Sequence, residues 1–143
     1  KYDYIIIGTP PSLGILTVNA FTFSDEIIIP STPGIFAANG IQQLSITVDN
    51  VKRYCNPQVK IVGILLTRYN SRINISKQIK DLTEQLGKHI SAPIYNAHIR
   101  NGIVVEEAQA NHKDIFSYAK KSTVSEDYYS FVEEFLKEEK KYA

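Results

Sequence analysis

The stretch Val59-Lys60-Ile61-Val62-Gly63-Ile64-Leu65-Leu66-Thr67 carries the strongest strand signal in this chain of 143 residues. Its aliphatic residues are nearly continuous and do not alternate with polar ones. Such a run is typical of a strand that is buried on both faces, as in a parallel sheet covered by helices. Asn56-Pro57 precedes it and a polar loop follows it. We therefore predict a buried strand over residues 59–67.

The same pattern occurs elsewhere, between segments with helical periodicity. Further strands are predicted at 3–8, around Ile5-Ile6-Ile7, at 26–30, and near 92–95. Apolar spacings of three and four predict helices at 13–23, 34–54, 75–86, 103–111 and from 125 onward, with Gly87 as a helix cap. Strands that alternate with helices predict an α/β fold with a parallel sheet and right-handed crossover helices, in a single domain over 1–143.

Chemistry in such a sheet gathers where the strands end. Because ligands bind outside the carboxyl ends of parallel strands, four segments are candidates for a functional site. These segments are residues 8–14, 30–34, 67–72 and 96–102.

Composition excludes several classes of function. A net charge of +1 does not mark a general nucleic-acid binder, so a DNA contact requires a local basic patch. The single Cys55 argues against a disulfide framework and favours a reducing compartment. No apolar run reaches about 18 residues and no signal peptide is evident, so a cytoplasmic protein is expected. The three histidines lack metal-binding spacing, and no serine lies in a triad pattern.

The opening stretch suggests a family. Tyr2-Asp3-Tyr4-Ile5-Ile6-Ile7-Gly8-Thr9-Pro10-Pro11-Ser12-Leu13-Gly14 resembles the Walker B and switch region of ParA/Soj-type partition ATPases, which are deviant Walker P-loop proteins related to MinD. Residues 24–30, 56–70 and 99–109 resemble later blocks of the same family, in the same order. The resemblance thus covers nearly the whole chain. For the first motif alone, a tight turn that leaves a strand is the alternative reading.

Two departures from the family pattern bear on activity. The family has an aspartate near the magnesium and the attacking water, and Gly8 stands at that position. The family's P-loop, which ends in Gly-Lys-Thr, does not occur in this sequence, because Gly87-Lys88 follows a helix and precedes His89. We expect the C-terminal half of a ParA-like domain, an incomplete P-loop fold that lacks the P-loop strand. ATP and magnesium belong to the intact family, and we expect neither tight binding nor ATPase activity here.

The resemblance also implies site residues. It assigns nucleotide contacts to Thr9, Pro10 and Pro11, with base contacts from the later loops at Thr67, Arg68, Ile99 and Arg100. Ordinary polar loops are the alternative reading of those later segments. For nonspecific DNA binding it offers five cations: Arg68, Arg72, Lys77, Lys80 and Arg100. A solvated helix face is the alternative for each lysine.

The expected function is that of a ParA-like protein in plasmid or chromosome partition. In the family, ATP drives a dimer onto DNA and a ParB-type partner stimulates hydrolysis, so the expected location is the nucleoid. One alternative is a noncatalytic remnant that dimerises or binds DNA. Another is a MinD-like regulator, although the glutamates of the last helix would repel anionic lipid and its aromatic stripe favours core packing. If the P-loop strand is missing, unpaired backbone groups require a partner or a rearrangement.

Overall fold

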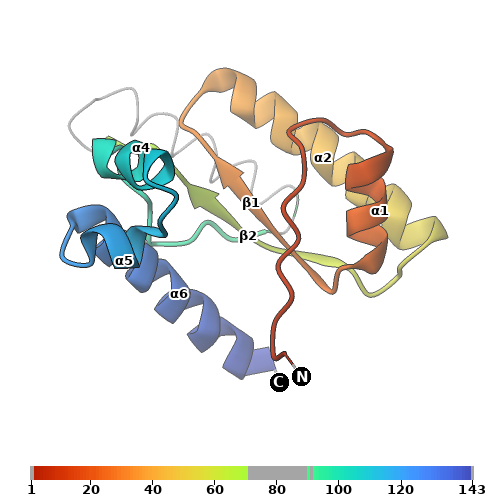
Figure 1. Ribbon diagram of the computed structural model, residues 1–143. Helices are drawn as coiled ribbons and strands as arrows, with labels where there is room; N and C mark the ends of the chain where they lie inside the picture. Colours follow the sequence, from red (N-terminus) through yellow and green to blue (C-terminus); the bar gives the residue numbers. More distant parts are fainter. Residues whose placement is uncertain (1, 71–89, 91, 143) are drawn as a thin grey trace.

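The computed structural model describes residues 2–70, 90 and 92–142 (Figure 1). The predicted helix at 75–86 and its cap at Gly87 lie outside these residues. The helices and strands are, in chain order, α1 (Ile15–Phe23), β1 (Glu26–Ser31), α2 (Ile35–Tyr54), β2 (Lys60–Leu66), α4 (Ile103–Ala110), α5 (Ile115–Ala119) and α6 (Thr123–Tyr142).

β1 and β2 form a parallel pair. Ile27 lies opposite Ile61 and Ile29 lies opposite Ile64, with a register shift between Ile27 and Ile28. On the other side of β2, Ile94 forms an isolated parallel bridge with Ile64. The prediction of an α/β fold with a parallel sheet is confirmed, although the predicted strand near 92–95 is reduced to this single bridge.

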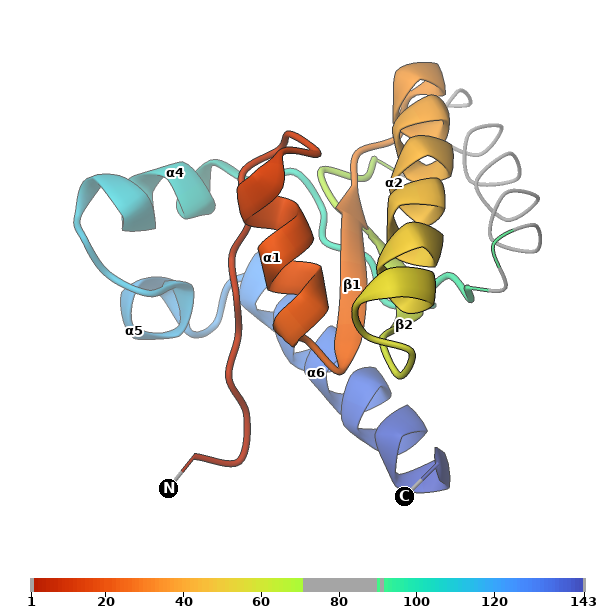
Figure 2. The same cartoon turned by 90° about the vertical axis from the view of Figure 1, so that its right-hand side faces the viewer.

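Helices cover both faces of the sheet. One core cluster joins Ile27, Ile29 and Ile64 to apolar residues of α1 and α2. The other joins the alternate residues Ile28 and Leu65 to the aromatic face of α6. Figures 1 and 2 show α1 and α2 on one side of the strands and α6 on the other. Because neighbouring strand residues point to opposite faces, this arrangement explains why the strands are apolar without alternation.

The predicted strand at 3–8 is wrong. Residues 4–10 have no regular structure, and Ile5 and Ile6 are 83% and 94% exposed. The run has the composition of a strand, but a strand is stabilised by hydrogen bonds to a neighbour. Within the described residues, the ladder of β1 is made with β2 and includes no residue of this segment. Apolar composition alone therefore does not produce a strand here.

The helix predictions that fall on described residues agree with the structure to within a few residues, and α5 was not predicted. Ile41, Val48 and Val51 of α2 are buried, as their spacing predicts. α5 begins at the N-cap Asp114, whose carboxylate accepts hydrogen bonds from two backbone N–H groups of the first turn. None of the described helices is long and apolar enough to cross a membrane.

Candidate functional site

The carboxyl ends of β1 and β2 lie side by side. The backbone N–H of Thr67, just past β2, donates to the carbonyl of Ser31 at 2.8 Å, and the Thr67 hydroxyl lies 3.4 Å from the same oxygen. Ser31, the last residue of β1, is buried. The two strands therefore remain paired up to the edge where a ligand of such a sheet would bind.

A second loop joins this edge. The N–H of Ile99 donates to the carbonyl of Leu66 at 2.8 Å, and the N–H of Tyr69 donates to the carbonyl of Ile99 at 3.0 Å. These bonds place the four later site candidates, Thr67, Arg68, Ile99 and Arg100, in two adjoining segments. The ring of Tyr69 also packs against the ring of His98, with centroids 4.5 Å apart.

Arg68 has an unusual backbone at this junction. Its φ of 52° lies in the left-handed region, which a residue with a Cβ seldom adopts. The residue is exposed, while its neighbour Tyr69 is buried. The reversal at Arg68 thus lets the chain leave β2 and pair at once with the segment around Ile99. Unfavourable backbone angles that persist in this way are more frequent at functional sites.

Arg100 forms a two-pronged ion pair with Asp127 of α6. The Nε and one terminal nitrogen of its guanidinium donate to the two carboxylate oxygens, each at 2.7 Å, and the backbone N–H adds a third bond at 3.0 Å. Burial acts to raise the pKa of Asp127, but the hydrogen bonds and charge of Arg100 outweigh it and hold this pKa below its usual value. The hydrogen bond with Asp127 likewise raises the pKa of Arg100.

Known proteins resemble this chain along almost its whole length. A family model described as an AAA domain matches residues 1–61. The chromosome partitioning protein ParA of Myxococcus xanthus is 36% identical over 137 residues, which are 96% of this chain and 47% of that protein. The sporulation initiation inhibitor protein Soj of Bacillus subtilis is 37% identical over 134 residues, 94% of this chain and 52% of that protein. Over almost its whole length the chain is similar to the ParA and Soj proteins.

The chain spans about half the length of these ParA and Soj relatives. Among solved structures, cobyrinic acid a,c-diamide synthase from Mycobacterium smegmatis superposes with a TM-score of 0.56 at 31% identity, over 65% of this chain and 37% of that one. A further structure of that synthase, with a TM-score of 0.55, has a bound ATP analog and magnesium. The shared fold is thus one on which a related protein binds a nucleotide.

The segment that carries the first ParA motif is exposed and leads into α1. Thr9, Pro10 and Pro11 are exposed, and no hydrogen bond between described residues joins them to the loop at 67–69 or to that at 96–100. The next residue, Ser12, is attached to α1, because the Thr17 hydroxyl donates to the Ser12 carbonyl at 2.6 Å. Figure 1 shows this N-terminal segment running past β1 to reach α1.

The described residues do not fit magnesium at the ParA motif. Gly8 has no side-chain oxygen, and a Cβ built at this position would meet nothing within 4 Å. In the part of the chain that the structure describes, no three His, Cys, Asp or Glu residues lie close enough to hold a metal ion. We therefore derive no hydrolytic step through a metal from these residues.

The proposed DNA patch is only partly visible. Arg72, Lys77 and Lys80 lie outside the described residues. Arg68 is exposed at the end of β2, whereas the charge of Arg100 is balanced by Asp127. Of the five cations, the structure thus describes only Arg68 and Arg100.

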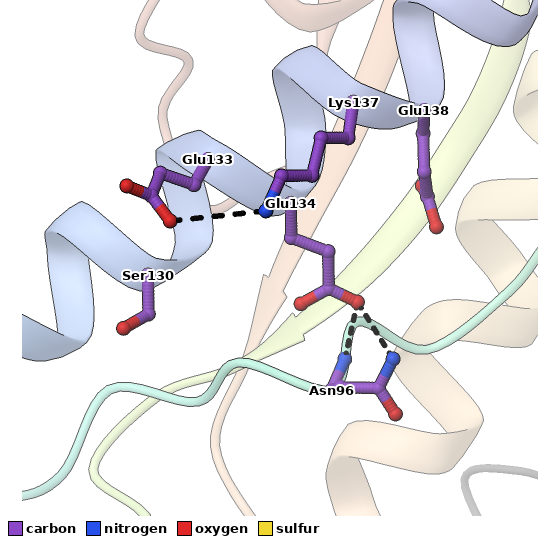
Figure 3. Close-up of a pocket in the computed structure, with 6 residues that line it drawn as sticks. All are labelled: Asn96, Ser130, Glu133, Glu134, Lys137 and Glu138. Carbon is purple, nitrogen blue, oxygen red and sulfur yellow. Dashed lines mark hydrogen bonds and ion pairs between the residues drawn. The ribbon is translucent and has the colours of Figure 1, made fainter.

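An open hollow of about 310 Å³ lies elsewhere, along α6. None of the predicted nucleotide residues lines it. Figure 3 shows its lining, which comes from the loop after Tyr95 and from α6: Asn96, Ser130, Glu133, Glu134, Lys137 and Glu138. Sequence reasoning missed the contacts of α6 with this loop, because Asp127 and Glu134 are far from it along the chain. Their spacing of seven residues, which places them on one helix face, was the available signal.

Proposed function

We propose that this chain acts in ATP-dependent DNA partition as part of a ParA-like protein of a plasmid or chromosome. The single observation that carries the proposal is the junction of the loops at 67–69 and 96–100 beyond β2, in a chain whose relatives are partition proteins. Thr67, Arg68, Ile99 and Arg100 then form the base side of a nucleotide site. Such a position, outside the carboxyl ends of parallel strands, is where ligands of open α/β sheets bind.

The base side of the site can be tested on the chain as it exists. We expect that titration of the ¹⁵N-labelled protein with ADP shifts the backbone amide resonances of Thr67, Arg68, Ile99 and Arg100. Changing Arg68 to alanine should weaken these shifts, whereas the matched change Arg53→Ala, at the exposed end of α2, should not. The absence of any shift in these loops at saturating ADP would contradict the base assignment.

We further propose that this chain alone does not hydrolyse ATP. The reason is chemical, since Gly8 supplies no oxygen where the family has a carboxylate, and its 143 residues contain no Gly-Lys-Thr loop. Phosphate release in the presence of ATP and magnesium should equal that of buffer. Magnesium-dependent turnover that copurifies with the chain through two separate columns would refute this proposal.

A noncatalytic module that binds DNA or a homologous chain is the second candidate. The observation in its favour is the exposure of Arg68, which three further candidate cations follow in the sequence: Arg72, Lys77 and Lys80. Replacement of Arg68, Arg72, Lys77 and Lys80 by alanine should abolish salt-dependent binding of a fluorescent DNA duplex. The matched control removes four cations elsewhere, namely Lys52, Arg53, Lys120 and Lys121. Equal loss of binding in both variants would mean that net charge alone is responsible.

The family suggests two further partners, a ParB-type protein and, for a MinD-like role, a lipid membrane. A ParB-type protein would act on the complete ATPase, and its binding to this chain can be measured by titration calorimetry. A MinD-like role would require binding to lipid vesicles. The glutamates on α6 argue against that role, so we expect no cosedimentation with anionic vesicles.

A further inference from the structure

α6 contacts the loop at 96–100 through two carboxylates. Glu134 accepts hydrogen bonds from the backbone N–H groups of Asn96 and Ala97, each at 2.7 Å, and from the Asn96 side-chain amide at 2.9 Å. Figure 3 shows this carboxylate directed at Asn96. Asp127 binds the other end of the loop through the backbone and guanidinium of Arg100.

The two carboxylates act on the same loop because of helix geometry. Asp127 and Glu134 are seven residues apart, which is close to two helical turns, so both lie on one side of α6. A rise of about 1.5 Å per residue separates them by roughly 10 Å along the axis. That separation is within the reach of the five residues from Asn96 to Arg100.

Apolar contacts hold the loop at both of its ends. Before it, the ring of Tyr95 packs edge-on against Phe131 of α6, with centroids 5.0 Å apart. After it, Gly102 lies so close to α6 that an added Cβ would be 2.5 Å from a methyl group of Val124. The loop is therefore packed against α6 at its ends and hydrogen-bonded to it between them.

The opposite side of the loop faces the proposed nucleotide edge. Ile99 exchanges backbone hydrogen bonds with Leu66 and Tyr69, which belong to the end of β2 and the turn beyond it. The position of α6 relative to the loop thus sets where Ile99 and Arg100 stand relative to Thr67 and Arg68.

We propose that Asp127 and Glu134 are positioning residues that fix the loop at 96–100 for contact with the nucleotide base. The proposal rests on the proposed function for the base contact, but the positioning of the loop can be tested by itself. It also gives Arg100 a defined role, in which the guanidinium ties the loop to α6 and does not bind DNA.

The test uses the whole chain and two conservative variants, Glu134→Gln and Asp127→Asn. We expect the hydrogen-exchange protection of the Asn96 and Ala97 amides to fall by about tenfold in E134Q, and that of the Arg100 amide in D127N, because charge-assisted bonds are lost. The control Glu133→Gln changes an exposed glutamate of the same helix, whose ion pair with Lys137 is 3.9 Å long. It should leave the loop protected.

A second control separates positioning from stability. Val48→Ala removes volume from the core on the other face of the sheet, so it lowers the melting temperature without a change at the loop. At matched loss of stability, V48A should keep both the loop protection and the ADP-induced shifts at Thr67 and Ile99, whereas E134Q should reduce both. If D127N does not fold, the measurement on E134Q alone tests the proposal.

The outcomes distinguish the two proposals. Unchanged loop protection in E134Q and D127N would overturn the positioning role, whatever the nucleotide does. Loss of loop protection together with no ADP-induced shift in the unmodified chain would leave α6 as a support of the loop, and would overturn both the base contact and the positioning role that serves it. Equal effects of V48A and E134Q would reduce the role of Glu134 to general stability and would also overturn the positioning role.

Discussion

Among the residues that the structure describes, the buried hydroxyl of Tyr95 has no hydrogen-bond partner, and the residue is only 3% exposed. Burial, together with the charges of Glu138, Glu26 and Glu134, raises the pKa of this phenol above its usual value. Removal of the hydroxyl in Tyr95→Phe should therefore leave the free energy of unfolding unchanged or raise it by about 1 kcal/mol. Urea unfolding at neutral pH measures this, with the exposed Tyr129→Phe as control. A loss above about 1 kcal/mol would mean that the hydroxyl has a partner in solution.

The ring of the same tyrosine leaves no room for a side chain at Gly63. A Cβ at this position would lie 2.4 Å from the Tyr95 ring, so Gly63→Ala should destabilise the protein by about 1–3 kcal/mol. The matched control is Gly40→Ala in α2, where an added Cβ meets nothing within 4 Å. There the change should stabilise by about 0.5–1 kcal/mol, because alanine favours a helix. Chemical denaturation measures the free energy of unfolding of both variants. Equal changes in the two would contradict the close approach at Gly63.

Asp127 makes stability depend on acid pH. Since its pKa is lower in the folded chain than in the unfolded one, its contribution is complete above the unfolded value, about 4, and is lost as pH falls through the folded value. The free energy of unfolding of the unmodified chain should fall more steeply below pH 4 than that of Asp127→Asn. Urea titrations at a series of pH values from neutral to acid provide the measurement. Parallel curves would show that the ion pair with Arg100 does not form in solution.

At the level of whole elements, α4 ends in an unfavourable backbone conformation. His112, just past the C-cap Asn111, has a φ of 51°. Its N–H donates to the Gln109 carbonyl and that of Lys113 donates to the Ala108 carbonyl, as in a Schellman motif. Because glycine adopts this conformation without strain, His112→Gly should stabilise the protein by about 0.5–1 kcal/mol, measured by thermal unfolding. The control His112→Ala keeps the strain and should not stabilise.

How far the sequence predicts an element depends on where its stabilising contacts lie. The helices α2 and α6 follow from spacings that are local in sequence, and β2 follows from a continuous apolar run. The isoleucine run at residues 5–7 gives the same local signal as β2, but within the described part of the chain no strand pairs with it. Pairing between distant segments is not visible in a single sequence.

The candidate site also has features that the sequence predicts and features that it does not. The junction of the loops at 67–69 and 96–100 could be predicted, because strand ends of a parallel sheet meet at one edge. The ion pair between Arg100 and Asp127 could not, because its partners are 27 residues apart and belong to different elements. The reversed backbone of Arg68 has no signal in the sequence, since arginine seldom adopts it.

The molecule as a whole presents apolar residues that a stable monomer would bury. Ile5, Ile6, Leu16 and Phe23 are each more than half exposed. Such surface favours association with a second chain, as the proposed partnership with a ParA chain requires. Sedimentation should show self-association of the unmodified chain, and Ile5→Ser combined with Ile6→Ser should reduce it. The control Ile46→Ser, at an exposed position of α2, should not. A monomer at all concentrations would contradict this prediction.

The two carboxylates of α6 also affect the order in which parts of the chain can fold. The loop at 96–100 leaves the ribosome before Asp127, and Asp127 leaves before Glu134. The Asn96 and Ala97 amides therefore cannot bind the Glu134 carboxylate until residue 134 has been synthesised. The sheet pair β1–β2 and its cover of α1 and α2 can form earlier, from contacts that precede this loop in the chain. The edge proposed for the nucleotide thus acquires its final shape after the β1–β2 pair and its cover can form.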